Sequence, residues 1–299
     1  MTVDALEQIR RASGDRTFDR FKTIRRSSPS TGVMNEASLW TDPAGRFSIT
    51  VVDGTAGGLI RFRYDERLSV DLTSDSELVI NAAVDVEPAL IEHFVADQVV
   101  PRAMAAEGQY VLHSATIRIG DRSIMILGAS GRGKSTLAAS FHVAGGTLLG
   151  DDATIVTWAG ELPASCPVYK SLRLLPDSIN ALLPRSTDTV AVSELTWKRR
   201  VMLPVDGSPA VDPLPIAAIF NIGEPTTDST IEIRPMTVGE TCMALVENAF
   251  ACNPADIGQA RKRLEKASKL ARSVPCFAMS YPRDYHSLGP VRAAMLDQL

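Results

Sequence analysis

A glycine-rich stretch constrains this chain more than any other feature. Residues 128–136 read Gly-Ala-Ser-Gly-Arg-Gly-Lys-Ser-Thr and fill every fixed position of the phosphate-binding pattern G-x-x-x-x-G-K-[ST]. Its glycines let the backbone curl tightly and turn N–H groups inward. Lys134 supplies a charge for the β- and γ-phosphates of a nucleotide, and the Ser135 hydroxyl can ligate Mg²⁺. We therefore predict that the whole loop binds a nucleotide through Gly128, Ala129, Ser130, Gly131, Arg132, Gly133, Lys134, Ser135 and Thr136, with the Arg132 side chain pointing outward.

The segments on either side of the loop support this prediction. Residues 123–127 form a short apolar run that suits a buried strand, and residues 136–144 are compatible with a helix. A helix that begins at the loop points its N-terminus at the phosphates, where its dipole stabilises negative charge. The alternative is a glycine-rich turn, or a degenerate loop that no longer binds.

Composition excludes several classes of function. The chain has 299 residues, 45% of them hydrophobic, and a net charge of −4, which gives no electrostatic case for a nucleic-acid partner. It contains no C-x-x-C pair among its four cysteines, so a cysteine metal or redox site is not expected. No apolar run of about 18 residues occurs, which predicts no membrane association and a soluble, cytoplasmic protein with access to ATP.

Two regions are predicted from the pattern along the chain. Residues 1–107 begin with a basic leader, which is expected to form a solvated amphipathic helix, and a linker follows over 27–45. After the linker come a small antiparallel sheet and a closing helix over 88–107, which Pro101 interrupts. The predicted strands of that sheet are residues 47–52, 59–64, 68–72 and 77–80. Residues 108–299 are expected to form the second region, which contains the loop.

Three chemical groups lie close to the loop in sequence. His113 precedes it on a predicted strand over 111–119, and Asp151 and Asp152 follow it. The strand after a loop helix usually returns beside the loop strand in a parallel sheet, which would place both aspartates near the phosphates. One carboxylate can then hold Mg²⁺ and the other can accept a proton from an attacking hydroxyl, in either assignment. A single His among apolar neighbours is, by itself, more typical of a satisfied core residue.

These stretches resemble the catalytic core of HPr kinase/phosphorylase and its relatives. The similarity is specific over roughly residues 108–160, through Val-Leu-His-Ser-Ala at 111–115, the loop itself, and Leu-Leu-Gly-Asp-Asp at 148–152. It implies an α/β fold with the P-loop kinase core of the HPr kinase/phosphoenolpyruvate carboxykinase type, and ATP and Mg²⁺ as its ligands. It further implies that one of Asp151 and Asp152 is the catalytic base, that His113 assists it, that Lys134 is catalytic, and that Ser135 and Asp151 hold the metal.

Looser similarity over 168–177, 198–200 and 274–282 points to the shorter HPr-kinase-related proteins, including lasso-peptide kinases. In those proteins a serine hydroxyl on a precursor peptide is phosphorylated. The resemblance therefore implies a peptide or small-protein partner bearing a serine, and it leaves a homo-oligomer possible. The glutamate-led, glycine-rich signature of true HPr kinases is replaced here by Tyr-Lys-Ser-Leu-Arg-Leu at 169–174, which argues against HPr as substrate and against phosphorolysis.

The basic side chains after the aspartates are candidates for phosphate or substrate contacts. These are Arg173, Lys198, Arg199 and Arg200. Guanidinium groups at such positions can bind a transferring phosphoryl group, although a run of charges is more often a solvated surface.

Other nucleotide-binding classes fit less well. A transporter ATPase requires a Leu-Ser-Gly-Gly-Gln signature, and a GTPase requires an Asn-Lys-x-Asp motif; the sequence contains neither. Two alternatives remain open beside a serine kinase. The first is a non-catalytic or regulatory nucleotide-binding module, and the second is a kinase that acts on a free small-molecule hydroxyl such as serine.

Overall fold

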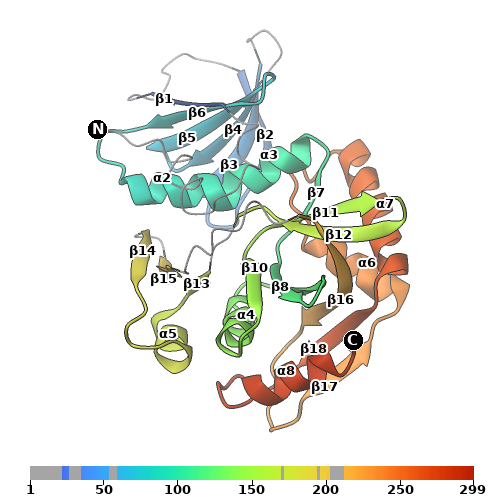
Figure 1. Cartoon of the computed structure of the whole chain (residues 1–299). Coiled ribbons are helices and arrows are strands. Elements are labelled where there is room, and N and C mark those ends of the chain that lie inside the picture. The colour runs from blue at the N-terminus through green and yellow to red at the C-terminus, as the bar shows by residue number, and fades with distance from the viewer. Residues whose placement is uncertain (1–21, 27–34, 54–58, 170–171, 194–195, 203–211) are drawn as a thin grey trace.

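In the part of the chain that the structure describes, three β-sheets and the helices packed on them form a mixed α/β fold (Figure 1). The structure is a computed structural model that describes residues 22–26, 35–53, 59–169, 172–193, 196–202 and 212–299. Most of the predicted basic leader lies outside these ranges. Its end, Lys22–Arg26, is not helical but forms strand β1, which pairs in parallel with β6.

The first sheet has six strands in the order β1-β6-β5-β4-β3-β2, and all pairs except β1–β6 are antiparallel. The remaining strands are β2 (Asn35–Thr41), β3 (Phe47–Asp53), β4 (Leu59–Tyr64), β5 (Leu68–Thr73) and β6 (Glu77–Ala82). The four predicted strands are confirmed. Strand β2, however, occupies much of the predicted linker, where it forms the edge of the sheet, with Trp40 packed on the core.

Alternation along the strands gives this sheet two different faces. Leu68 and Val70 of β5 are buried in an apolar cluster together with the helical segment that follows the sheet. Asp71 points to the opposite face, where the Nε of its cross-strand neighbour Arg61 donates to Oδ1 at 2.7 Å. The ion pair is buried, and its fork geometry satisfies both charges.

The helical segment after the sheet runs without a break from residue 88 to 106. It comprises α2 (Pro88–Phe94), the π-helical turn η2 (Val95–Val99) and α3 (Val100–Ala106). The sequence predicted an interruption at Pro101, and the structure places it just upstream as the π-turn. Proline has no N–H and its ring crowds the carbonyl four residues earlier, which is that of Asp97. The wider turn relieves both problems.

The second sheet has nine strands and contains the loop. Its main order is β10-β8-β9-β16-β12-β11-β7, and β18 pairs with both β16 and β17. The strands are β7 (Tyr110–Leu112), β8 (Ala115–Ile119), β9 (Arg122–Gly128), β10 (Thr147–Gly150), β11 (Thr154–Ala159), β12 (Leu162–Pro167), β16 (Leu214–Ile222), β17 (Glu232–Pro235) and β18 (Cys276–Ser280). The single strand predicted over 111–119 is two strands, since β7 pairs with β11 whereas β8 pairs with β9 and β10.

The prediction that the strand after the loop helix lies directly beside the loop strand is wrong. Strand β10 does not lie beside β9; it pairs antiparallel with β8, which itself pairs antiparallel with β9. Strand β8 follows directly before β9 in a tight hairpin and takes the position beside it, so β16 is the parallel neighbour of β9 on the other side. Two antiparallel steps restore the direction of β10, so its carboxyl end still lies at the same edge of the sheet as the end of β9.

Five further helices and a small third sheet complete the described chain. The third sheet comprises β13 (Arg173–Leu174), β14 (Thr189–Ser193) and β15 (Thr196–Val201), in the order β13-β15-β14. The helices are α4 (Lys134–Val143), α5 (Pro176–Leu182), α6 (Val238–Glu247), α7 (Ile257–Ser273) and α8 (Leu288–Leu296). Helix α6 begins with a reciprocal capping box between Thr237 and Glu240, and the Asp256 carboxylate caps α7.

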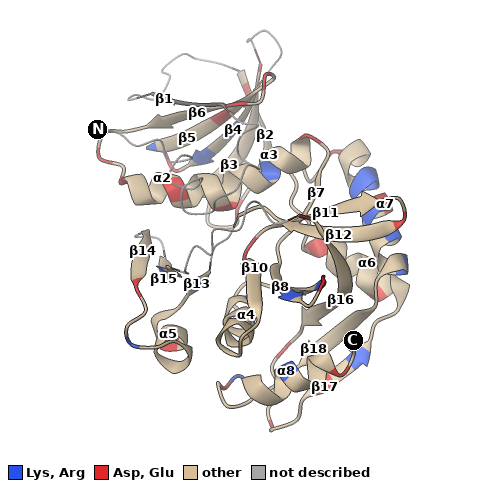
Figure 2. Ribbon diagram, viewed as in Figure 1, with Lys and Arg blue, Asp and Glu red and all other residues tan. Residues whose placement is uncertain are grey.

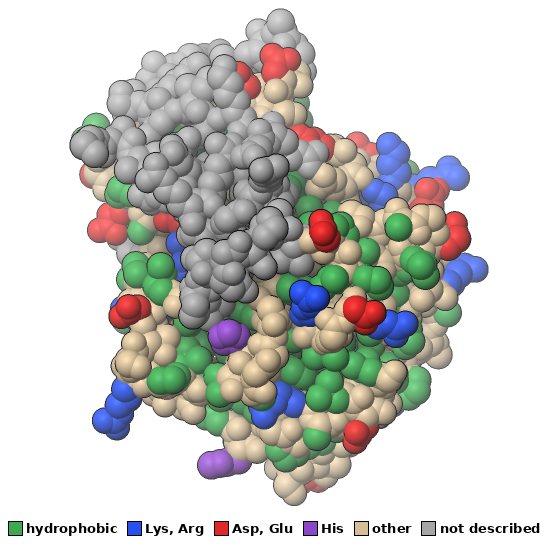
Figure 3. All heavy atoms as spheres, viewed as in Figure 1, with side chains coloured by type: hydrophobic (Ala, Val, Ile, Leu, Met, Phe, Trp, Pro, Cys, Tyr) green, Lys and Arg blue, Asp and Glu red, His purple; other side chains and the backbone are tan. Residues whose placement is uncertain are grey.

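Several basic residues lie along α7 (Figure 2). On the face seen in Figure 3, basic and acidic side chains are interspersed rather than gathered by sign. Among the described residues, none of the helices combines the length and apolar character needed to span a bilayer.

Candidate active site

The predicted loop is a sharp connection between strand β9 and helix α4. The strand ends at Gly128, the helix begins at Lys134, and the three loop glycines have φ values of +140°, +79° and +95°. A Cβ on Gly128 would lie 2.8 Å from the carbonyl oxygen of Ile222 on β16. Only glycine fits there, because the left-handed backbone and the close approach of β16 both exclude a side chain.

Lys134 folds back over this loop. Its Nζ donates to the carbonyl oxygens of Gly128 at 2.7 Å and Ala129 at 3.3 Å, and only 5% of the residue is exposed. Burial lowers the pKa of Lys134, against the opposing effect of the Asp151 and Asp152 charges. The loop carbonyls therefore hold the Lys134 ammonium against the loop backbone.

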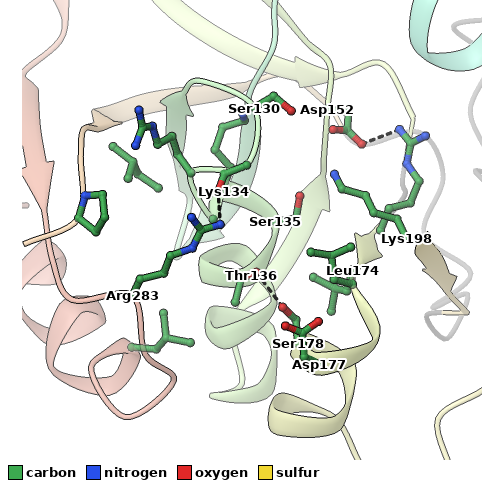
Figure 4. Close-up of a pocket in the computed structure, with 18 of the residues that line it drawn as sticks. Ser130, Lys134, Ser135, Thr136, Asp152, Leu174, Asp177, Ser178, Lys198 and Arg283 are labelled. Atoms are coloured by element: carbon green, nitrogen blue, oxygen red, sulfur yellow. Dashed lines mark hydrogen bonds and ion pairs between the residues drawn. The ribbon is translucent and has the colours of Figure 1, made fainter. Parts of the chain in front are cut away.

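A cavity of about 470 Å³ opens over the loop, within the range of roughly 300–1,000 Å³ typical of small-molecule sites. Residues 130–136 form one wall, and segments from β15, α5 and the turn before α8 form others (Figure 4). Two residues of the π-turn, Asp97 and Gln98, also line it. The N-terminal region thus contributes directly to the site.

The two predicted aspartates follow β10 but have different surroundings. Asp152 lines the cavity, whereas Asp151 is fully buried behind it. Burial, reinforced by the charge of Asp152, raises the pKa of Asp151 to about 7. The nearby Ser135 hydroxyl acts in the opposite direction, although neither Asp151 oxygen has a partner within hydrogen-bond distance among the described residues.

Asp152 is held as an anion. It adopts a left-handed backbone conformation with φ of +73°, which is uncommon for a residue other than glycine. Its Oδ2 accepts from Nη2 of Arg173 at 2.5 Å. Burial acts to raise the pKa of Asp152, but the positive charges of Arg173 and Lys198 outweigh it, so the pKa lies below its usual value.

His113 lies between β7 and β8, and it lines the same cavity. Its Nδ1 is 2.9 Å from the backbone oxygen of Asp152. Because a carbonyl oxygen only accepts, Nδ1 carries the proton and Nε2 remains an acceptor in the neutral ring. Burial and the charge of Lys134 lower the pKa of His113, which favours that neutral form.

Arg173 connects the cavity to the N-terminal region. Besides Asp152, it forms an ion pair with Asp97, and it donates to the hydroxyl oxygen of Tyr169 at 3.2 Å. Tyr169 donates in turn to Asp97 Oδ1 at 3.1 Å, and Nδ1 of His93 lies 3.0 Å from the other Asp97 oxygen. Arg173 is 2% exposed, so this network fixes the guanidinium firmly beside the predicted catalytic carboxylate.

The remaining basic candidates, Lys198, Arg199 and Arg200, all lie on β15 but contact different surroundings. Lys198 lines the cavity and points toward Asp152 and Ser135 (Figure 4). Its Nζ forms no hydrogen bond or ion pair with any residue in the described ranges. Arg199 points the other way and donates to Thr189, and Arg200 forms an ion pair with Glu92 of α2. Neither of these two arginines lines the cavity, so the structure does not support their predicted substrate contacts.

Arg132 also forms an ion pair within the chain. Its guanidinium makes a two-pronged ion pair with the Glu224 carboxylate at the rim of the cavity, where the Glu224 side chain is 76% exposed. This agrees with the expectation that the side chain points away from the inside of the loop.

Several residues that line the site were not predicted from the sequence. Besides Asp97 and Gln98 they come mostly from the segments around α5 and before α8: Ser178, Tyr281, Arg283 and Tyr285. Arg283 Nη2 donates to the Gly131 carbonyl at 2.7 Å, and Ser178 Oγ lies 3.2 Å from both Thr136 Oγ1 and the Tyr285 hydroxyl (Figure 4). No sequence motif marks these positions, because chain segments far apart meet only through the fold.

The donor set fits a divalent cation of the Mg²⁺ type. Both oxygens of Asp151 are buried and unpartnered in the described structure, beside the Ser135 hydroxyl. No group of three or more His, Cys, Asp or Glu side chains in the described ranges is arranged to hold a metal ion. A nucleotide-bound Mg²⁺ needs fewer protein ligands, because phosphate oxygens and water complete its coordination.

Comparison with known proteins identifies no family for this chain. No protein-family model matches it, and no curated relative matches its sequence. Among solved structures, it is similar to the Hpr(Ser) kinase/phosphatase from Coxiella burnetii, with 12% identity over 63% of this chain and 97% of that chain, and a TM-score of 0.31. A likeness this distant assigns no function, so the site must be judged by its own residues.

Proposed function

We propose that this protein is an ATP-dependent phosphotransferase that phosphorylates a serine hydroxyl on a peptide or small protein. The observation that carries the proposal is the meeting of a phosphate-binding loop with Asp152 and His113 in one cavity. A carboxylate beside a triphosphate repels it, so a protein that only bound nucleotide would bind more tightly without Asp152. A phosphotransferase needs such a group to accept a proton.

The loop N–H groups and Lys134 would bind the β- and γ-phosphates. Ser135 and Asp151 would hold Mg²⁺, which screens phosphate charge when it is bound. The unpartnered Asp151 oxygens support this role, and Asp152, which faces the cavity, is then the group that takes the proton.

The transfer exchanges one phosphorus–oxygen bond for another. The acceptor hydroxyl oxygen bonds to the γ-phosphorus, the bond from that phosphorus to the β–γ bridging oxygen breaks, and ADP leaves with the electron pair. The hydroxyl proton passes to Asp152, with neutral His113 as a second acceptor nearby. Lys198 and Arg173 line the same cavity, which supports a role for them in stabilising charge on the transferring group. Preorganised charges of this kind supply much of the catalysis in phosphoryl transfer.

The direct test is transfer of radiolabelled γ-phosphate from Mg-ATP to serine-containing peptides. Lys134→Ala and Asp152→Asn should each abolish transfer, and Asp152→Asn should still bind ATP. Asp121→Asn, in the exposed β8–β9 turn, is a matched control that should transfer phosphate at the wild-type rate. Wild-type protein that binds Mg-ATP but phosphorylates no serine acceptor would instead be a nucleotide-binding module.

A further inference from the structure

Part of the cavity wall comes from the π-turn of the N-terminal region, away from the loop in the sequence. Asp97 and Gln98 are consecutive residues of η2, and both line the cavity. A π-turn has more residues per turn than an α-turn, so neighbouring side chains lie closer together around the helix axis. The position of Pro101 thus explains why two adjacent polar residues reach the same site.

The two residues offer different chemistry to a ligand. Asp97 is committed to Arg173, His93 and Tyr169. Gln98 has one fixed end, because Nη1 of Arg102 donates to its side-chain Oε1 at 2.9 Å and to its backbone oxygen at 3.0 Å. Its two amide N–H donors have no hydrogen-bond partner in the described part of the chain.

Arg102 is itself held without a carboxylate partner among the described residues. Its guanidinium carbon lies 5.1 Å from the ring centre of Phe47, 5.3 Å from that of Phe250 and 5.9 Å from that of Trp40. Burial lowers the pKa of Arg102 to about 10, so the group is still charged at neutral pH. The aromatic rings offer no hydrogen-bond acceptor oxygen to this cation, so Nη1 of Arg102 donates to the two oxygens of Gln98 instead.

We propose that Gln98 is a specificity-determining residue for the acceptor, whose N–H groups bind a carbonyl or carboxylate oxygen of the molecule that carries the hydroxyl. Arg102 is its positioning residue. The proposal rests on the proposed phosphotransferase function. Lys198, which is unpaired among the described residues and lies in the same cavity, also favours an oxygen-bearing acceptor over a cationic one.

The test compares two acceptors in the transfer assay, each titrated at saturating Mg-ATP. Free L-serine presents a carboxylate, whereas a blocked pentapeptide with a central serine presents only carbonyl oxygens. Gln98→Leu keeps the size of the side chain but removes its donors. It should raise KM about tenfold for whichever acceptor supplies the oxygen, with kcat and the Kd for ATP within twofold of wild type.

Variants of Arg102 test whether this residue positions Gln98 or only stabilises the fold. Arg102→Met should reproduce the KM increase of Gln98→Leu, and Arg102→Lys, which retains a cationic donor in the aromatic cage, should restore most of the wild-type KM. Gln298→Leu, at the exposed C-terminal end, is the matched control and should leave both kinetic constants unchanged.

Each outcome bears on a different claim. A change in KM for serine alone identifies a carboxylate, and a change for the peptide alone identifies a carbonyl; either supports the proposal. Equal KM values for Gln98→Leu and wild type with both acceptors overturn it while leaving the phosphotransferase function intact. Wild-type protein that phosphorylates neither acceptor overturns the proposed function, and this inference with it.

Discussion

Arg173 holds Asp152 as an anion, with 2.5 Å between Nη2 and Oδ2, while the adjacent Asp151 has no partner in the described structure. Two carboxylates that are neighbours in sequence therefore have opposite electrostatic environments. The pKa of Asp152 is lowered and that of Asp151 is raised to about 7. Such a separation of two carboxylates is typical of sites in which each performs a different task.

Arg173→Ala should destabilise the protein strongly. It removes the shared cation and leaves the largely buried carboxylates of Asp97 and Asp152 without it, a loss that typically costs about 3–5 kcal/mol. Urea denaturation measures the free energy of unfolding. Arg122→Ala, at an exposed position of β9, should change it by less than about 0.5 kcal/mol. A similarly small change for Arg173→Ala would show that the network does not stabilise the fold.

Asp151 should make the nucleotide-free protein less stable as pH rises. Its folded pKa of about 7 lies above the unfolded value of 3.8, so the stabilisation from its protonated form is complete below pH 3.8 and is lost as pH rises through 7. Asp151→Asn removes this loss, so its advantage over wild type should grow from pH 5 to pH 8, to at most about 4 kcal/mol.

Chemical denaturation in EDTA at both pH values measures this difference. Asp152 contributes no slope in that window, because its lowered pKa keeps it ionised throughout. An identical stability difference between Asp151→Asn and wild type at pH 5 and pH 8 would contradict the raised pKa.

Gly128→Ala should both unfold the loop region and abolish nucleotide binding. The added Cβ meets the Ile222 carbonyl oxygen at 2.8 Å on a backbone with φ of +140°, which together cost on the order of 3 kcal/mol. Gly120→Ala is a matched control with φ of +62° and nothing within 4 Å of the new Cβ. It should lower the thermal midpoint by less than Gly128→Ala and leave ATP affinity unchanged; equal effects of the two variants on both measurements would refute the steric argument.

Lys198→Gln should reduce the rate of transfer more than the affinity for nucleotide. The Lys198 ammonium has no partner in the described structure and points toward Asp152 and Ser135 (Figure 4), which suits it to stabilise the charge that the proposed transfer would develop. Loss of one such donor typically lowers kcat about 10²- to 10³-fold. Single-turnover kinetics and ATP titration separate the two effects, with Lys262→Gln on the surface of α7 as control. A larger change in ATP affinity than in kcat would place Lys198 on the nucleotide instead.

The sequence alone located the glycine-rich loop, its flanking strand and helix, the four antiparallel strands and the two aspartates. These features depend on local chemistry: glycine permits positive φ, alternation fixes the faces of a strand, and a motif of fixed spacing carries its own geometry. The sequence also marked Pro101 as an interruption, since the missing N–H is a property of one residue.

Only the tertiary structure decided which side chains share the cavity. It inserted β8 between β9 and β10, left Arg199 and Arg200 outside the cavity, and brought Asp97, Gln98 and Arg283 into it from distant segments. It also shifted the pKa values of Asp151 and Asp152 in opposite directions, which two residues of the same type cannot show in the sequence. The reason is physical: burial and ion pairing depend on what surrounds a group in space, and a chain's neighbours in space are set by packing rather than by sequence order.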